Sequence, residues 1–245
     1  MTETTAVGPE PHGSPAPDRQ PLSRRLVIAA AIEHVDSDGV ASLTMRGLGK
    51  RLGVEAMSLY RYVNGREDLL EGVVDGLMDQ LDADPGDRLQ PEDGWQAYLQ
   101  WVAHEVRAMA LAHPAAFPLV ATRHPAAPWL RPPLRSLRLV EQFLDALVRR
   151  GFSDEQAAQA YRSFTTFLLG HLLQETATHR RADSVLDEPL DEGDASVPNR
   201  DGDTTTADFP TLRRLRPLLS QDHDTEEFER ALEGLLDRMD RTVSQ

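Results

Sequence analysis

The chain contains no cysteine among its 245 residues. This absence excludes disulfide frameworks, cysteine-ligated zinc, iron–sulfur clusters and thiol nucleophiles. No apolar run approaches the roughly 18 residues that a membrane-spanning helix needs. The acidic, Pro-rich N-terminus also lacks the apolar core of a signal peptide. We therefore expect a cytoplasmic protein with no membrane partner.

Motifs of catalysis and phosphate binding are also missing. The sequence has no Gly-x-Ser-x-Gly, no His-Glu-x-x-His and no obvious catalytic pair. Residues 47–51 faintly resemble a phosphate loop, but no strand precedes them and no Ser or Thr follows Lys50. His171, Glu175 and His179 share one helix face, an arrangement commoner among solvated residues than among metal ligands. We expect no enzyme, no cofactor and no metal site.

The formal net charge of −14 seems to disfavour a nucleic-acid partner, but it is unevenly distributed. Residues 19–70 hold eight basic and six acidic side chains, a net of +2. Residues 181–208 hold nine acids and two arginines, a net of −7. This asymmetry indicates that the front segment meets an anion while the remainder does something else.

Apolar residues recur at helical spacing, and no segment alternates as a half-buried strand does. Ser23 and Thr44 are suitable N-caps, and Ser153 with Gln156 forms a capping box. The protein is predicted to be all-α, with about nine or ten helices. We expect them near residues 24–38, 45–52, 56–63, 67–81, 95–113, 115–121, 134–150, 153–179 and 228–239.

Two of these short helices meet at Gly53, which is typical of a helix-turn-helix. Leu48, Leu52, Val54 and Leu59 can pack into the corner between them. The outer face then carries small and hydroxyl-bearing side chains, flanked by the basic residues Arg46, Lys50, Arg51 and Arg66. Spacing alone leaves two interpretations open, because any two short helices around a glycine look alike.

The same stretch resembles the DNA-binding domain of TetR-type transcriptional repressors, and the likeness is closest to the tetracycline-repressor branch. It is carried by Leu43-Thr44, Arg46, Leu48, Leu52-Gly53-Val54, Leu59-Tyr60, Val63 and Asp68-Leu69-Leu70, and further on by Trp95-Gln96, Gly151-Phe152-Ser153 and Leu169-Gly170.

The resemblance implies an N-terminal three-helix DNA-binding domain and a larger helical ligand-binding and dimerisation domain. We expect a disordered tail over residues 1–21, the helix-turn-helix domain over 22–69, and the effector and dimer domain over 70–245, with a flexible acidic loop over 181–208.

In that family the second and third helices contact operator DNA. Arg46 fits a base-reading role, because a guanidinium can bond O6 and N7 of guanine together. Carried over to this sequence, the implied contacts are Thr44, Met45, Arg46, Ala56, Met57, Ser58, Tyr60, Arg61, Tyr62 and Arg66. Ala56 and Met57 replace the Gln and Pro of the tetracycline repressor, which predicts a different operator.

The effector site departs from that branch. Val102, Val106 and Val120 stand where it has the Asn, Phe and His that hold a tetracycline–magnesium chelate. Valine offers no ligand to a hard cation. We expect instead an apolar effector pocket formed by Trp101, Val102, Val106, Val120, Phe143, Tyr161 and Phe164, with Gln174 as a polar contributor. The alternative is that these residues are simply core.

The expected partners are double-stranded operator DNA, a small-molecule effector and a second copy of the chain. The family's dimer seam, formed by its eighth and tenth helices, is predicted to use Ala157, Ala160, Leu168, Leu172, Leu232, Leu235 and Met239. Three alternatives stay open: a helical small-molecule-binding protein or enzyme with a vestigial DNA domain, a regulator without a small-molecule effector, and an activator.

Overall fold

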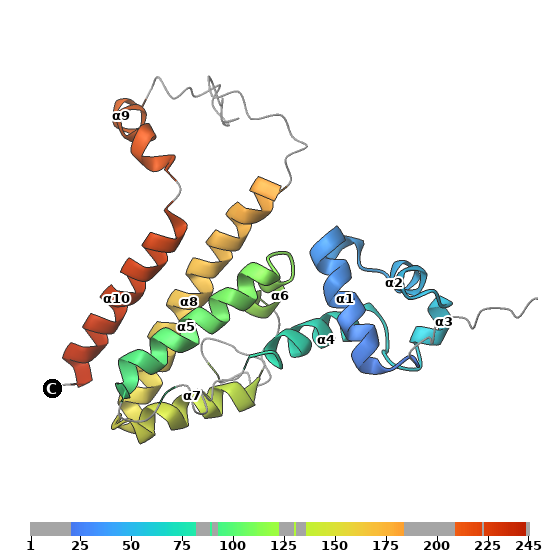
Figure 1. Ribbon diagram of the computed structural model, residues 1–245, viewed down its shortest axis with the longest axis horizontal. Helices are drawn as coiled ribbons and strands as arrows, with labels where there is room; N and C mark the ends of the chain where they lie inside the picture. The colour runs from blue at the N-terminus through green and yellow to red at the C-terminus, as the bar shows by residue number, and fades with distance from the viewer. Residues whose placement is uncertain are drawn as a thin grey trace, which may run out of the picture.

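The computed structural model describes residues 21–81, 89, 93–122, 130, 136–183, 209–221 and 223–243. Within these ranges the regular secondary structure is helical and contains no strand, which confirms the predicted all-α class (Figure 1). The helices are α1 (Arg24–Asp38), α2 (Met45–Leu52), α3 (Ala56–Leu59), α4 (Arg66–Met78), α5 (Gly94–Ala112), α6 (Phe117–Thr122), α7 (Leu137–Arg149), α8 (Asp154–Asp183), α9 (Pro210–Leu219) and α10 (Asp224–Val243), with a 3₁₀ turn over Val40–Ser42.

The helices fall into two groups that α4 connects. In Figure 1, α1, α2 and α3 gather at one end of the molecule, and the longer helices α5, α7, α8 and α10 form a bundle at the other. Helix α4 packs against α1 on one side and α6 on the other. The expected domain boundary after residue 69 therefore falls inside α4, a helix that belongs to both groups.

Local signals set the first helix boundaries as predicted. The Ser23 hydroxyl accepts a hydrogen bond from the Leu26 amide at 3.2 Å, and the Thr44 hydroxyl accepts one from the Gly47 amide at 3.0 Å. Helix α2 ends at Gly53, whose φ of +67° is favourable for glycine because it lacks a Cβ. These caps satisfy backbone groups that a helix end leaves unpaired.

Glycine also permits the close packing of α1 against α4. A Cβ at Gly72 would collide with the Ile28 side chain, and one at Gly76 would lie 3.1 Å from atoms of Ile28 and Ile32. The side chains of Val27 and Val73 are fully buried nearby in the same core. The position of α4 relative to α1 is thus fixed by backbone-to-side-chain contact.

A buried ion pair and an aromatic cluster hold the larger bundle together. Arg107 of α5 donates from Nε to both carboxylate oxygens of Glu175 of α8 at 3.1 Å, and from Nη2 to the Thr225 hydroxyl of α10 at 2.9 Å. The Arg107 guanidinium also lies 5.0 Å from the centre of the buried Phe228 ring. Three elements distant in sequence therefore meet at one arginine.

Several sequence expectations need correction. The third helix ends at Leu59 rather than near residue 63, because the Tyr62 amide bonds the Leu59 carbonyl three residues back, which makes a turn in place of the four-residue helical pattern. Helix α8 continues to Asp183, into the start of the expected acidic loop. The rest of that loop, and residues 1–20 of the expected tail, lie outside the described residues.

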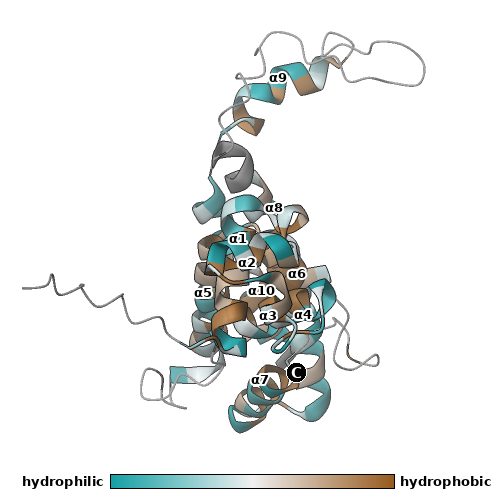
Figure 2. Ribbon diagram, turned by 90° about the vertical axis from the view of Figure 1, so that its right-hand side faces the viewer, coloured by the Kyte–Doolittle hydropathy of each residue, from teal (hydrophilic) through white to brown (hydrophobic). Residues whose placement is uncertain are grey.

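Helix α9 was not predicted. Every residue in it is exposed, including Leu218 and Leu219 at 65% and 66%. Figure 2 shows it standing apart from the other helices, with hydrophobic and hydrophilic residues along its length. Its PTLRRLRPLL sequence is short and contains an internal proline, which weakens the helical signal in the sequence.

Asp68 joins the start of α1 to the start of α4. Its carboxylate accepts hydrogen bonds from Arg24 Nη2 at 2.6 Å and from the Asn64 amide at 2.8 Å. The bonds from Arg24 and then from Asn64 hold the pKa of Asp68 below its ordinary value of 3.8. A carboxylate bonded in this way stabilises the fold as long as it stays ionised.

We predict that Asp68→Asn lowers the free energy of unfolding at pH 7 by about 1 kcal/mol, the low end for bonds to a charged group because Arg24 is half exposed. Because the pKa of Asp68 is lower in the folded state than in the unfolded state, the Asp68 carboxylate makes its full contribution to stability above its unfolded-state pKa. This contribution is lost as the pH falls from the unfolded-state pKa through the folded-state pKa. Urea unfolding measures the difference. Asp145→Asn, in an exposed pair with Arg149, is the control and changes stability by less than about 0.5 kcal/mol.

Candidate DNA interface and ligand cavity

Helices α2 and α3 form a tight helix-turn-helix corner. The Val54 amide bonds the Gly49 carbonyl at 2.9 Å, and a Cβ on Gly49 would lie 2.9 Å from the Val54 carbonyl oxygen. Leu48 and Leu59 are fully buried beneath the corner. The close approach leaves the opposite sides of both helices facing solvent.

The solvent-facing side of this corner carries most of the predicted DNA contacts. Arg46 and Arg61 are exposed, and Met57 and Tyr60 are 76% and 47% exposed. We call these four residues the outer face. Three further predicted residues border it: Ala56 and Ser58 are half-buried, and Thr44 is exposed while its hydroxyl caps α2.

Three predicted DNA contacts are placed differently. Met45 is only 9% exposed and belongs to the core, so the structure does not bring it to the outer face. Tyr62 is half-buried against the same core, and its carbonyl accepts a bond from Arg24 Nη1 at 2.8 Å. Arg66 is exposed, and its guanidinium donates to the backbone carbonyls of Leu43 and Val40 at 3.0 Å each.

Arg66 has a structural role that the sequence pattern did not show. Its two bonds tie the first turn of α4 to the segment that precedes α2. The sequence pattern missed this because both acceptors are backbone atoms more than 20 positions away. Arg66 is therefore a structural brace of the corner, and its role as a phosphate contact stays a prediction.

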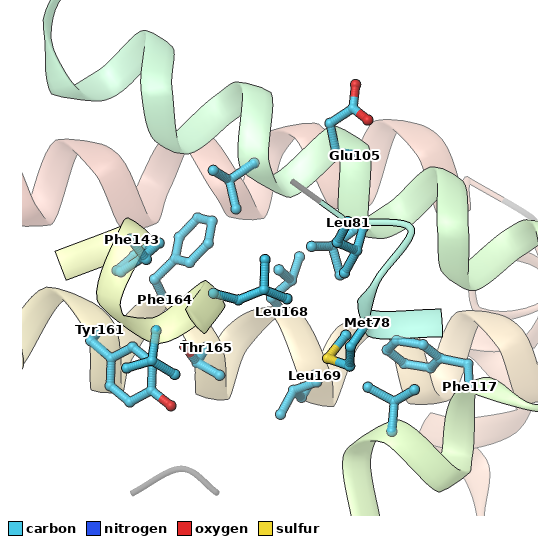
Figure 3. A pocket seen from close by; sticks show the side chains of 15 residues that line it. Met78, Leu81, Glu105, Phe117, Phe143, Tyr161, Phe164, Thr165, Leu168 and Leu169 are labelled. Carbon is cyan, nitrogen blue, oxygen red and sulfur yellow. The ribbon is translucent and has the colours of Figure 1, made fainter. Parts of the chain in front are cut away.

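An apolar cavity lies in the larger bundle, between the end of α4 and helices α5 to α8 (Figure 3). Its empty volume is about 700 Å³ with its open mouth included. The lining consists of Met78, Leu81, Val102, Glu105, Val106, Phe117, Val120, Leu139, Val140, Phe143, Tyr161, Phe164, Thr165, Leu168 and Leu169.

The structure brings together six of the eight predicted effector residues in this cavity: Val102, Val106, Val120, Phe143, Tyr161 and Phe164. Trp101 does not line it and packs against Tyr98, with ring centroids 6.2 Å apart. Gln174 is exposed and also lies outside the cavity, so neither residue is placed as predicted.

Sequence reasoning missed the wall that the end of α4 supplies, and part of the α6 wall. Met78 and Leu81 come from α4 and the residues after it, and Phe117 comes from α6, next to the predicted Val120. Their only sequence signal is hydrophobicity, which core residues share. Figure 3 shows Met78 and Phe117 side by side at one end of the cavity, next to Leu169 of α8.

The cavity offers few polar groups. Among the residues that line it, Glu105 is the one that carries a formal charge at neutral pH, and it is exposed at the margin. Burial raises the pKa of Tyr161 to about 12, so its hydroxyl stays protonated and neutral. Apart from Glu105 the lining is neutral and mainly hydrocarbon, and it holds no cluster of carboxylates or imidazoles that could bind a cation.

Metal chemistry finds no other support in the described residues. No group of three His, Asp or Glu side chains there is placed to hold a metal ion. Glu175, the central residue of the His171, Glu175 and His179 pattern on α8, is paired with Arg107 instead.

No helix among the described residues is long and apolar enough to cross a membrane.

The predicted dimer-seam residues are buried within one chain. Ala157, Ala160 and Leu172 of α8 and Leu232 of α10 are at most 4% exposed, and Leu168 lines the cavity. Helices α8 and α10 pack on each other in the single chain, and this contact uses the apolar stripe of each. A second copy must meet other residues of these helices.

We predict that Arg66→Ala destabilises the protein by about 1–3 kcal/mol, because it leaves two carbonyls without their charged donor. Thermal unfolding measures the loss. Arg61→Ala, an exposed arginine of the outer face, is the matched control and shifts stability by less than about 0.5 kcal/mol. Equal stability of the two variants would contradict the brace.

Comparison with known proteins places this architecture in a family. The family model described as "Tetracyclin repressor-like, C-terminal domain" matches residues 88–243. An HTH-type transcriptional regulator of Saccharopolyspora erythraea is 29% identical over 183 residues, 72% of each chain. Tetracycline repressor protein class C of Escherichia coli is 27% identical over 181 residues, which cover 73% of this chain and 78% of that protein.

A solved structure agrees with these sequence matches. A possible TetR family transcriptional regulator from Streptomyces coelicolor superposes with a TM-score of 0.66 at 25% identity, covering 90% of this chain and all of that one. Since the family model spans residues 88–243, well over half of the chain, the protein belongs to the TetR family of transcriptional regulators.

Proposed function

We propose that this protein is a ligand-responsive transcriptional repressor that binds a palindromic operator as a homodimer and is released by a small, mainly apolar effector. The observation that carries the proposal is the apolar cavity, which shares α4 with the DNA-binding helices. A regulator needs both a DNA-reading surface and a separate site whose occupancy alters it.

The outer face supports DNA reading. Arg46 and Arg61 are exposed there, and Lys50 is exposed on the same short helix as Arg46. Positive side chains near the corner can neutralise phosphates, and a guanidinium at Arg46 can bond a guanine edge in the major groove. The strongly acidic back half of the chain would keep the rest of the protein away from DNA.

Exposed residues of α8 and α10 support a homodimer. Thr166, Gly170 and Ala177 are exposed on α8, and Ala231 and Gly234 are exposed on α10. Among the described residues, apart from the neighbouring backbone of the same helix, no atom lies within 4 Å of the Cβ positions of the two glycines. Small exposed side chains allow two helix pairs to approach closely, as in the four-helix dimer bundle implied by the resemblance.

Ligand response would reach the DNA-binding helices through α4. Met78 at the end of α4 lines the cavity, while Leu69 and Leu70 near its start are buried in the core shared with α1. A displacement of α4 would move the two DNA-binding groups of a dimer apart. Operator affinity would then fall, because both groups must fit their half-sites at once.

The parent protein is first used to select an operator fragment from random-sequence DNA. We predict that Arg46→Ala weakens binding to this fragment by about 1–3 kcal/mol and relaxes the sequence preference at one base pair per half-site. Fluorescence anisotropy measures the affinity. Arg213→Ala on α9 makes the same charge change far from α2 and is the control (Figure 1). An Arg46→Ala variant that binds like the parent would contradict the interface.

A second prediction concerns the cavity. The neutral fluorophore phenylnaphthylamine should bind the parent and gain emission in the presence of EDTA, because the lining is apolar and needs no metal. Val106→Trp should lower this affinity at least tenfold by filling the cavity, and leave operator binding intact. Val148→Trp, at an exposed position outside the cavity, is the control. Binding that requires added magnesium would overturn the apolar site.

A further inference from the structure

A hydrogen bond joins α1 to the end of α5, across 77 positions of sequence. The imidazole of His113 donates from Nδ1 to Oδ2 of Asp36 at 2.6 Å, and the two side chains are only 21% and 23% exposed. The other carboxylate oxygen of Asp36 is buried and has no hydrogen-bond partner within the described chain. His113 is therefore the group that compensates this partly buried carboxylate.

On one side, the pair is attached to a wall of the apolar cavity. His113 ends α5, and its carbonyl accepts bonds from the amides of Ala116 at 3.1 Å and Phe117 at 2.9 Å, which start α6. Phe117 is fully buried and lines the cavity together with Val120, one turn further along α6. Any shift of α6 is thus transmitted to the His113 backbone.

On its other side, the pair is attached to the helix-turn-helix. Asp36 lies in the last turn of α1, next to Ser37 and Asp38. Arg51 of α2 donates from Nη1 to the Ser37 hydroxyl at 3.1 Å, and the same nitrogen lies 3.7 Å from Asp38 Oδ2. One helical turn therefore contacts the cavity wall through Asp36 and α2 through its two neighbours.

We propose that the Asp36–His113 pair is a positioning contact that couples occupancy of the apolar cavity to the helix-turn-helix, by a route through α6, α1 and α2 that is separate from α4. This inference rests on the proposed function of the cavity. A ligand that fills the cavity contacts Phe117 and displaces the six-residue helix α6. A hydrogen bond is lost once its heavy atoms separate beyond about 3.5 Å, so a displacement of about 1 Å is enough to break this 2.6 Å bond.

The fold does not depend on this pair for the packing of the DNA-binding helices. Helices α1 and α4 are held by apolar and glycine contacts around Ile28 and Gly72. A matched pair exists elsewhere: His104 of α5 and Glu229 of α10 lie 2.8 Å apart, but both belong to the larger bundle. The two pairs have the same chemistry, and only Asp36–His113 connects the bundle to α1.

The test compares amide hydrogen exchange of the full chain with and without saturating phenylnaphthylamine. In the parent, the probe should change exchange at least threefold in α6 and in the segment from the last turn of α1 through α2. In Asp36→Ala and in His113→Ala, the probe should bind within twofold of the parent and still affect α6. In these two variants, the probe-induced change in exchange over residues 36–52 should fall to less than a third of the change seen in the parent.

Control variants separate coupling from general stability. His104→Ala and Glu229→Ala should keep the full parental response. Asp36→Asn retains an oxygen that can accept the imidazole N–H, and this variant should restore at least half of the parental response over residues 36–52. If Asp36→Ala proves unstable, Asp36→Ser makes the same break, because its hydroxyl is too short to reach His113. A full response over residues 36–52 in the broken variants would overturn the proposal.

The ligand-free measurement keeps this inference apart from the proposed function. Without any probe, Asp36→Ala and His113→Ala should raise amide exchange at least fivefold both in α6 and in the last turn of α1. Each variant breaks the Asp36–His113 hydrogen bond, which restrains both segments. Unchanged exchange in either segment would overturn the coupling pair. If the parent fails to bind phenylnaphthylamine, the apolar ligand site is wrong, and this ligand-free comparison still decides the role of the pair.

Discussion

The contact between α1 and α4 is the constraint on which the rest of the molecule depends. Glycines at positions 72 and 76 bring the α4 backbone against Ile28 and Ile32, closer than any residue with a side chain would permit. Helix α4 also ends in the cavity wall at Met78. The close spacing of α1 and α4 that the two glycines permit therefore determines where the DNA-binding corner lies relative to the bundle. A larger residue at Gly72 would force the helices apart and change both regions at once.

The sequence predicted features that depend on neighbours along the chain. The caps at Ser23 and Thr44, and the capping box of Ser153 with Gln156, join atoms three residues apart. Such interactions can be read from spacing alone. The helix starts and the all-α fold class could therefore be predicted from local patterns.

Features that depend on distant partners could not be predicted in this way. The sequence indicates only a phosphate contact for Arg66, yet its guanidinium donates to the carbonyls of Val40 and Leu43. Gln174 shares a helix with the cavity residues Tyr161 and Phe164, but it lies on the opposite, exposed side. Periodicity tells which residues share a face and not which face meets which neighbour.

The larger bundle keeps the architecture of the tetracycline repressor-like family, and its cavity has an apolar lining. Valines at positions 102, 106 and 120 all line the cavity, so the site is formed by shape and hydrocarbon contact. Hydrophobic sites discriminate weakly between ligands of similar size, because one methylene changes binding by only about 1–3 kcal/mol. Selectivity in such a site comes from its outline and from the few polar groups near Tyr161 and Thr165.

The ion pair between Arg107 and Glu175 gives the molecule an uneven stiffness. Sliding α5 past α8 would take Arg107 away from the Glu175 carboxylate, whose side chain is 1% exposed, at a cost of about 3–5 kcal/mol. The six-residue helix α6 has no comparable anchor to α8 or α10 among the described contacts. Thermal motion and any strain introduced into the bundle will therefore concentrate on the side nearest the DNA-binding helices, and the opposite side will behave as a rigid frame.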